Sequence, residues 1–173
     1  MNAGLLIVRL LLGSVLLAHS GQKMMGWFQG PGLDASSKIF EALGHRPGRV
    51  MVTVAATCEL VAALSLLLGL ATPVGVAMAS GTLLVAGVSQ TVRAGKAWNA
   101  LGGGEYPLVL AVLALALGFT GPGAWAIDRA LFDDFPTYIG IGVVAIAVLA
   151  ATPPCLRARR EIKRLQAAGS PTQ

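Results

Sequence analysis

Five apolar runs separated by shorter polar segments dominate the pattern of hydrophobic and polar positions along the chain. Several of these runs approach or exceed the ~18 residues that mark a transmembrane helix. The run VMVTVAATCELVAALSLLLGL is long enough to cross about 30 Å of hydrocarbon at about 1.5 Å per residue. The pattern therefore predicts an all-α transmembrane helical bundle, with helices over about 3–20, 47–68, 73–92, 105–120 and 136–152.

Turn residues between the runs set the expected ends of these helices. Gly69 suits a helix C-terminus, Thr72 an N-cap and Pro73 the first helical position, which predicts a tight antiparallel hairpin. Gly121-Pro122-Gly123 breaks the fourth run, and we expect Pro153-Pro154 to stop the fifth.

Helix 73–92 is rich in small residues at spacings of four, including Gly75, Ala79 and Gly87. Small side chains let two helix backbones approach closely, so we expect this face to pack closely on a neighbour.

The remaining chain divides into two interfacial segments, 21–46 and 121–135, and a basic tail, 153–173. In the first segment Asp34 or Ser36 is a candidate cap for a short helix ending before Gly44. Trp27 and Phe28 just before it indicate a position at the membrane interface.

Composition supports a membrane protein, because 55% of the residues are hydrophobic and only 12% are charged, whereas soluble domains have about 25% charged residues. The net charge of +5 comes from basic residues that lie between and after the apolar runs. Such residues indicate topology rather than nucleic-acid binding.

With five spanning helices, eleven Lys and Arg residues fall on one side, in the loops after helices one and three and in the tail. Because loops rich in Lys and Arg stay in the cytoplasm, we expect the N-terminus outside and the C-terminus inside a bacterial cell (inner) membrane. A cleaved signal peptide is disfavoured because Arg9 interrupts the first apolar run and nothing basic precedes it.

Arg9 and Glu59 are ionisable residues within apolar runs. Because a lone charge is costly in lipid, we expect the two to pair across helices one and two. Two roles stay open: a site for a polar head group, a proton or a small anion, or a structural pair that fixes the helix register.

A second candidate set lies toward the cytoplasmic side, where polar residues from helix one, helix three and the following loop would line a pocket: His19, Lys23, Gln90, Asn99 and Glu105. The alternatives are that Lys23 extends to the lipid head groups and that Glu105 interacts with a helix N-terminus. On the outer side, Asp128 is interpreted as an interfacial cap rather than a catalyst.

The pattern contains no convincing ligand set for haem or a metal, since His19 and His45 lack a third ligand at a suitable spacing. The GGG at 102–104 lacks the strand and Lys-Ser/Thr pair of a nucleotide loop. Cys58 and Cys155 are expected at different depths, which disfavours a disulfide.

Four stretches resemble the DoxX family of small bacterial membrane proteins: RLLLGSVLLAHSGQKM, LGHRPG, CELVAALSLLLGLATPVG and GGGEYPLVLAVLALALGFTGPGAWAIDRAL. The resemblance covers about residues 5–131 and implies a four-helix core, beyond which the fifth helix and the basic tail extend. The positions that carry it are Arg9, His19, Gly21, Lys23, Glu59, Gly69, Glu105, Gly121, Pro122, Gly123 and Asp128.

The resemblance implies a membrane subunit of a quinone-linked or thiol- and sulfur-handling redox complex, with a quinone or small anion as the candidate ligand. It would lack a complete active site of its own. The alternative is a non-catalytic membrane scaffold or assembly factor that binds partner proteins, and homo-oligomers are compatible with either. A small-solute transporter is a third hypothesis, disfavoured because one short chain without a visible internal repeat is unusual for that class.

Overall fold

The computed structural model describes residues 2–131 and 135–168, and all regular structure in this part of the chain is helical. The all-α bundle predicted from the sequence is confirmed. Its elements are α1 (Asn2–Met25), η1 (Trp27–Gln29), α2 (Gly32–Ala42), α3 (Gly48–Leu68), α4 (Thr72–Ala94), η2 (Asn99–Leu101), α5 (Glu105–Thr120), α6 (Ile127–Leu131) and α7 (Thr137–Ala168). Residues 132–134 of the predicted interfacial segment and 169–173 of the predicted tail lie outside the described part.

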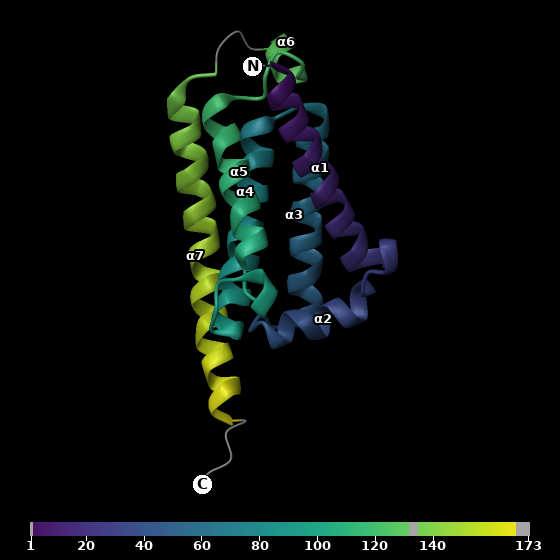
Figure 1. Ribbon diagram of the computed structural model, residues 1–173, viewed down its shortest axis with the longest axis vertical. Coiled ribbons are helices and arrows are strands. Elements are labelled where there is room, and N and C mark those ends of the chain that lie inside the picture. Colours follow the sequence, from purple (N-terminus) through teal and green to yellow (C-terminus); the bar gives the residue numbers. More distant parts are fainter. Residues whose placement is uncertain (1, 132–134, 169–173) are drawn as a thin grey trace.

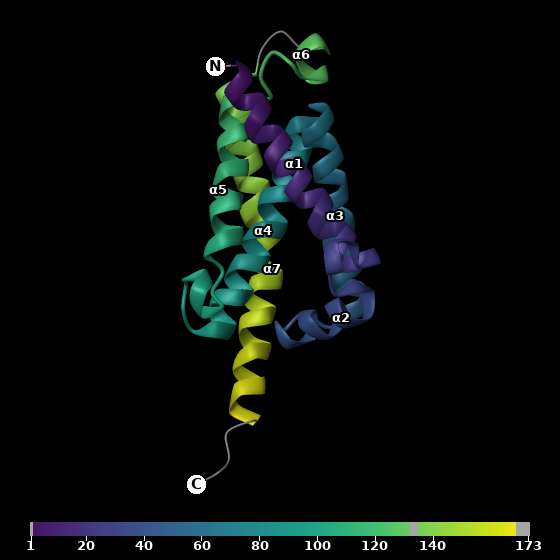
Figure 2. The same cartoon turned by 45° about the vertical axis from the view of Figure 1, so that its right-hand side comes forward.

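Four helices, α1, α3, α4 and α7, are long and apolar enough to cross a membrane. The apolar helix α5 has 16 residues, or about 24 Å at 1.5 Å per residue, and packs beside α4 and α7. These five helices form the bundle, whereas α2 lies across one end of it and α6 sits at the other (Figures 1 and 2).

Helix α4 is the central element, in contact with α3, α5 and α7. Half of its apolar window is buried, a larger share than in the other long helices. Gly75 packs against Ser65 of α3, Gly81 lies near Ala147 of α7, and Gly87 packs against Leu108 of α5. The close packing expected of these small residues is therefore present, and it involves three neighbouring helices.

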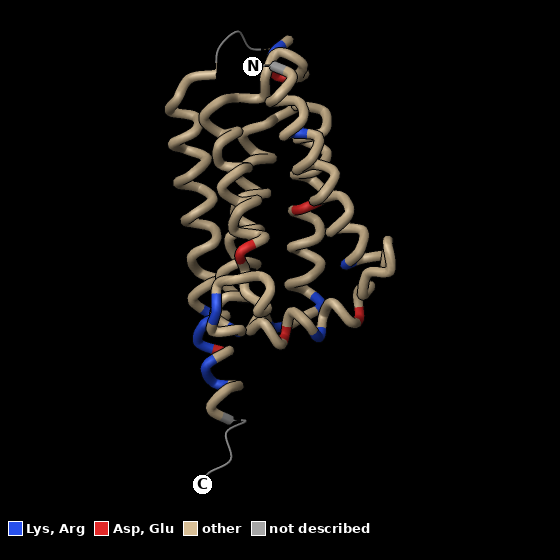
Figure 3. Tube along the Cα trace, in the orientation of Figure 1, with Lys and Arg blue, Asp and Glu red and all other residues tan. Residues whose placement is uncertain are grey.

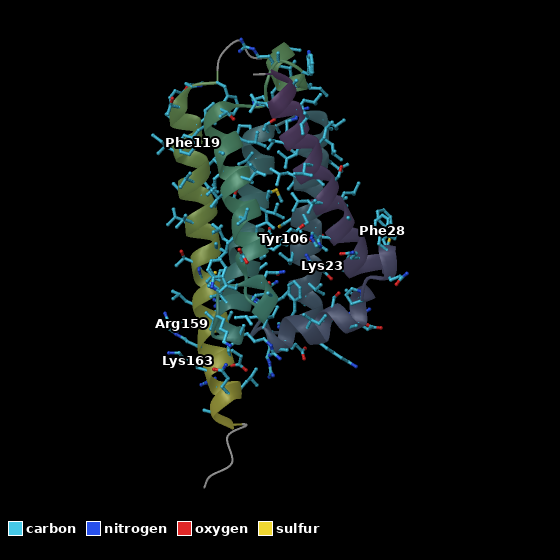
Figure 4. All side chains as sticks on the ribbon, viewed as in Figure 1. Lys23, Phe28, Tyr106, Phe119, Arg159 and Lys163 are labelled. Atoms are coloured by element: carbon cyan, nitrogen blue, oxygen red, sulfur yellow. The ribbon has the colours of Figure 1, made fainter. Side chains whose placement is uncertain are left out.

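Apolar residues from α1, α3, α4, α5 and α7 make the core, including Leu12, Leu66, Val76, Leu117 and Val143. Many large apolar side chains on the outer faces stay exposed, as expected where helices face lipid. Phe28 at the α1–α2 connection is one, and its ring projects outward from the bundle (Figure 4).

Helix α7 continues through Pro153 and Pro154 to Ala168, so the expectation that the prolines end this helix is wrong. Two prolines remove two backbone donors from the helix, but packing of the following turns offsets that loss. Ala158 and Ile162 are buried, and Gly44 lies against the backbone of Ala158. The predicted tail is thus largely an extension of the last helix.

The glycines of the loop after α4 allow its backbone to pack directly against neighbouring backbone. A Cβ on Gly104 would collide with the carbonyl of Gly87, and one on Gly103 with the backbone of Ala97. Gly104 is thus required by packing against α4 and Gly103 by packing within the loop, whereas Gly102 has a left-handed φ of 81°.

Candidate functional site

Arg9 is almost fully buried and is held by backbone carbonyls. Its Nε donates to Leu66 O at 2.8 Å and its guanidinium nitrogens donate to Pro122 O at 2.8 Å and Trp125 O at 3.1 Å, with a longer contact to Leu67 O at 3.5 Å. Carbonyls at the end of α3 have no helical partner of their own, so they are available as acceptors. Arg9 thus joins α1 to the end of α3 and to the loop after α5.

The close approach of Arg9 depends on Gly69, which ends α3 with φ of 65°. A Cβ at Gly69 would lie 2.7 Å from the guanidinium of Arg9. Only a glycine at this turn leaves the guanidinium room to reach the end of α3.

The predicted Arg9–Glu59 pair is wrong, because Glu59 has a different partner. Lys23 forms an ion pair with Glu59 Oε1, joining α1 to α3. Glu59 is 3% exposed, whereas the Lys23 side chain is 21% exposed. Figure 4 shows Lys23 on α1 facing α3.

The register of the antiparallel α1 and α3 explains this choice of partner. Ser20 Oγ donates to Ala56 O, Gly13 packs on Ala63, and Arg9 reaches Leu66. Arg9 therefore lies about seven residues of α3, or roughly 10 Å, from Glu59. The long stem of Lys23 points back toward the start of α1 and meets Glu59, as side chains on helices do; the alternative that Lys23 extends to the head groups is not what the structure shows.

A cavity of about 170 Å³ opens beside this pair, between α1 and α2. It is lined by His19, Gln22, Lys23, Pro31, Ser36, Ile39 and Phe40. The volume is below the ~300–1,000 Å³ of typical ligand pockets, so it suits a small head group rather than a nucleotide.

Two polar atoms at the site have no hydrogen-bond partner in the part of the chain that the structure describes. Ser36, a cavity-lining residue that is 2% exposed, has a buried hydroxyl of this kind. Glu59 of α3 has a second carboxylate oxygen that is likewise buried, and its first pairs with the cavity-lining Lys23. Unpaired buried polar groups cost free energy, so each marks a place where a ligand or water would be stabilising.

The predicted pocket residues are brought together in part. His19 and Lys23 line the cavity, and the ring of His19 makes an edge contact with Tyr106, centroids 6.2 Å apart. Glu105 precedes Tyr106, and its carboxylate accepts from the backbone of Asn99 at 3.1 Å. This hydrogen bond ties the loop after α4 to the first turn of α5, which carries Tyr106. Gln90, half-buried on α4, is not among the cavity-lining residues.

Sequence reasoning missed Ser36, Gln22 and Phe40 as cavity residues. The local pattern makes Ser36 a candidate helix cap, but α2 begins at Gly32, so Ser36 lies inside the helix. The amphipathic pattern of α2 carried the missing signal, because Ile39, Phe40 and Ser36 share one face.

Asp128 caps α4 from a distant part of the chain. Its carboxylate oxygens accept from the backbone of Ala71 and Thr72, each at 2.7 Å, and its own backbone N–H donates to Gly69 O. A carboxylate at a helix N-terminus is favourable for both hydrogen bonding and the helix dipole. Thr72, the predicted N-cap, is the first helical residue, and its buried hydroxyl has no partner within residues 2–131 and 135–168. Asp128 also interacts electrostatically with Arg9.

His45, in the loop after α2, is a separate buried polar residue. Its Nε2 lies 2.9 Å from Ser89 Oγ, and burial lowers the pKa of its imidazole. Among residues 2–131 and 135–168, no three His, Cys, Asp or Glu side chains are grouped as metal ligands would be.

The family model named DoxX matches residues 4–91 of the chain, which is about half its length. The chain belongs to the DoxX family. No curated protein and no solved structure matches it.

The matched residues of this DoxX protein run from α1 to near the end of α4. They contain Arg9, the Lys23–Glu59 pair and the cavity with Ser36. Asp128 lies beyond the match, and so does the loop after α5, whose carbonyl at Pro122 accepts a hydrogen bond from Arg9.

Proposed function

We propose that this DoxX protein is a subunit of a membrane redox complex and holds the polar head of a quinone in the cavity between α1 and α2. The observation that carries the proposal is a cavity lined by both Lys23 and Ser36, the latter with a buried hydroxyl that has no hydrogen-bond partner among the described residues. Quinone carbonyls are hydrogen-bond acceptors, and the ammonium and the hydroxyl are donors.

The apolar lining supports a ring-shaped head group. Ile39 and Phe40 of α2 and Pro31 offer apolar contacts to a flat ring, while Lys23 and Ser36 orient its oxygens. The isoprenoid tail would lie along the exposed apolar faces of the bundle. Electrons would come from a partner subunit of the complex.

The Lys23–Glu59 pair has a defined role in this proposal. Glu59 holds the ammonium of Lys23 inside the bundle, so that it faces the cavity rather than the aqueous side. Replacing Glu59 by Gln keeps the shape and removes the charge that attracts the ammonium.

We expect Glu59→Gln and Ser36→Ala each to weaken binding of a short-tailed benzoquinone by about fivefold to tenfold, the loss of one charge-assisted or neutral hydrogen bond. The measurement is quenching of tryptophan fluorescence in the purified chain, since Trp27 packs against Gly21 beside the cavity. Asp34→Asn is the control, because Asp34 makes a carboxylate–arginine pair at the exposed surface.

Quinone reduction by membranes that carry these variants gives the second readout. Undiminished reduction and unchanged quenching for Glu59→Gln and Ser36→Ala would refute the quinone site. That result would instead favour the scaffold role, in which the chain binds partner proteins without a ligand.

We also propose that the N-terminus lies outside and the C-terminus in the cytoplasm of a bacterial cell membrane. The support is the charge distribution: Lys and Arg gather at the end of the bundle that carries α2 and the end of α7 (Figure 3). Basic ends of this kind stay cytoplasmic.

A further inference from the structure

A second and larger cavity, of about 670 Å³, lies between the loop after α2 and the C-terminal part of α7. We call it the basic groove. It is lined by Gly44, Arg46, Arg157, Arg160, Glu161, Lys163 and Arg164.

The cations of the basic groove are presented on a fixed surface. Arg157, Arg160 and Arg164 are three and four residues apart, so they share one face of α7. The adjoining residues Ala158 and Ile162 are 1% and 2% exposed, which anchors this part of α7 against the bundle.

The charge in the basic groove is strongly unbalanced. Five cationic side chains surround one carboxylate, Glu161, which lies 3.6 Å from Arg46 and 3.9 Å from Arg164. Arg157, Arg160 and Lys163 are exposed. An anion entering the groove would relieve repulsion between these side chains.

The length of α7 places the groove at the depth of lipid head groups when the hydrocarbon is taken to begin at Thr137. From Thr137, where α7 begins, twenty residues of helix at 1.5 Å each cover about 30 Å, the thickness of the hydrocarbon. This places Arg157 where the hydrocarbon ends and Arg164 about 10 Å further along.

We infer that the basic groove binds the head-group phosphate of an anionic phospholipid from the adjacent leaflet. Basic pockets beside membrane helices favour such lipids. The bound phosphate would connect Arg46, in the loop between α2 and α3, to the arginines of α7, and so would hold the end of α7 against that loop.

The test is native mass spectrometry of the full chain in detergent, titrated with phosphatidylglycerol or phosphatidylcholine. We expect phosphatidylglycerol to bind more tightly, and Arg160→Gln to weaken it by about fivefold. Arg159→Gln is the matched control: Arg159 is exposed on the same helix, is not among the groove-lining residues, and lies on the side of α7 away from α2 (Figure 4).

Equal binding of the two lipids, or equal losses for Arg160→Gln and Arg159→Gln, would overturn the inference. Displacement of the lipid by millimolar inorganic phosphate would also overturn it, since the groove would then be a site for soluble anions. The triple variant Arg157→Gln, Arg160→Gln, Arg164→Gln should abolish the preference for phosphatidylglycerol; a preference that persists would count against the groove.

Discussion

Arg9 is a buried cation whose hydrogen-bond partners are backbone carbonyls. Those carbonyls come from the end of α3 and from the loop after α5. A guanidinium has five N–H donors in a fixed plane, which lets one side chain reach two separate segments. The residue therefore acts as a joint between three parts of the bundle.

We expect Arg9→Met to destabilise the folded protein by about 3 kcal/mol or more, because the carbonyls at Leu66 and Pro122 lose a charged donor. Thermal unfolding in detergent measures the effect. Arg129→Met is the control, since Arg129 is an exposed arginine at the same end of the bundle. A melting temperature for Arg9→Met equal to that of the control would contradict this role.

The apolar pattern identified Arg9 and Glu59 as residues that need partners, but not which partners they have. That choice depends on the register of α1 against α3 and on carbonyls exposed by the turn at Gly69, and neither is encoded in the spacing of apolar residues. Ser36 was missed as a cavity residue for a related reason: the position of α2 across the bundle end is a tertiary feature.

At the scale of elements, local signals predicted well where a helix end is set by its own residues. Gly69 ends α3, and Gly121 follows the end of α5 at Thr120. Local signals failed where a distant contact sets the helix end. Helix α7 continues through Pro153-Pro154, and the N-terminus of α4 is capped by Asp128 and not by Thr72.

Docking of α7 on the loop at Gly44 offers a direct test at this scale. Gly44 has φ of 79°, and a Cβ there would lie 2.6 Å from the carbonyl oxygen of Ala158. We expect Gly44→Ala to release the end of α7, so that trypsin cuts after Arg157 and Arg160 at least several times faster than in the unmodified chain.

Gly95→Ala is the matched control, because Gly95 has a similar φ of 66° and open space around it. It shares the backbone strain, about 1–2 kcal/mol for a left-handed non-glycine residue, but not the collision. Equal cleavage of α7 in both variants would show that strain alone, and not contact with Ala158, is responsible.

At the scale of the whole molecule, charge separates the two ends of the bundle (Figure 3). Positive residues gather near α2 and the end of α7, whereas α6, at the other end, carries one residue of each sign, Asp128 and Arg129. The eleven basic residues of the loops and tail can be read from the sequence. The uneven distribution of charge between the two ends is therefore predictable without knowledge of any tertiary contact.

Membrane orientation is checked by cysteine labelling in a Cys58→Ser, Cys155→Ser background. An impermeant maleimide added to intact spheroplasts should label Arg129→Cys at the α6 end and leave Lys96→Cys unlabelled until the membrane is opened. Both positions are exposed. Labelling of Lys96→Cys alone would reverse the proposed topology.

The contacts of Asp128 extend this view to the family match itself. The carboxylate that completes the first turn of α4, and the carbonyls of Pro122 and Trp125 that hold Arg9, lie outside residues 4–91. A fragment cut to the matched region would leave α4 without its N-terminal cap. Arg9 would lose its hydrogen bonds to Pro122 and Trp125 and keep those to the end of α3. The family match therefore ends before the residues that complete the fold, and we expect residues 4–91 alone not to fold.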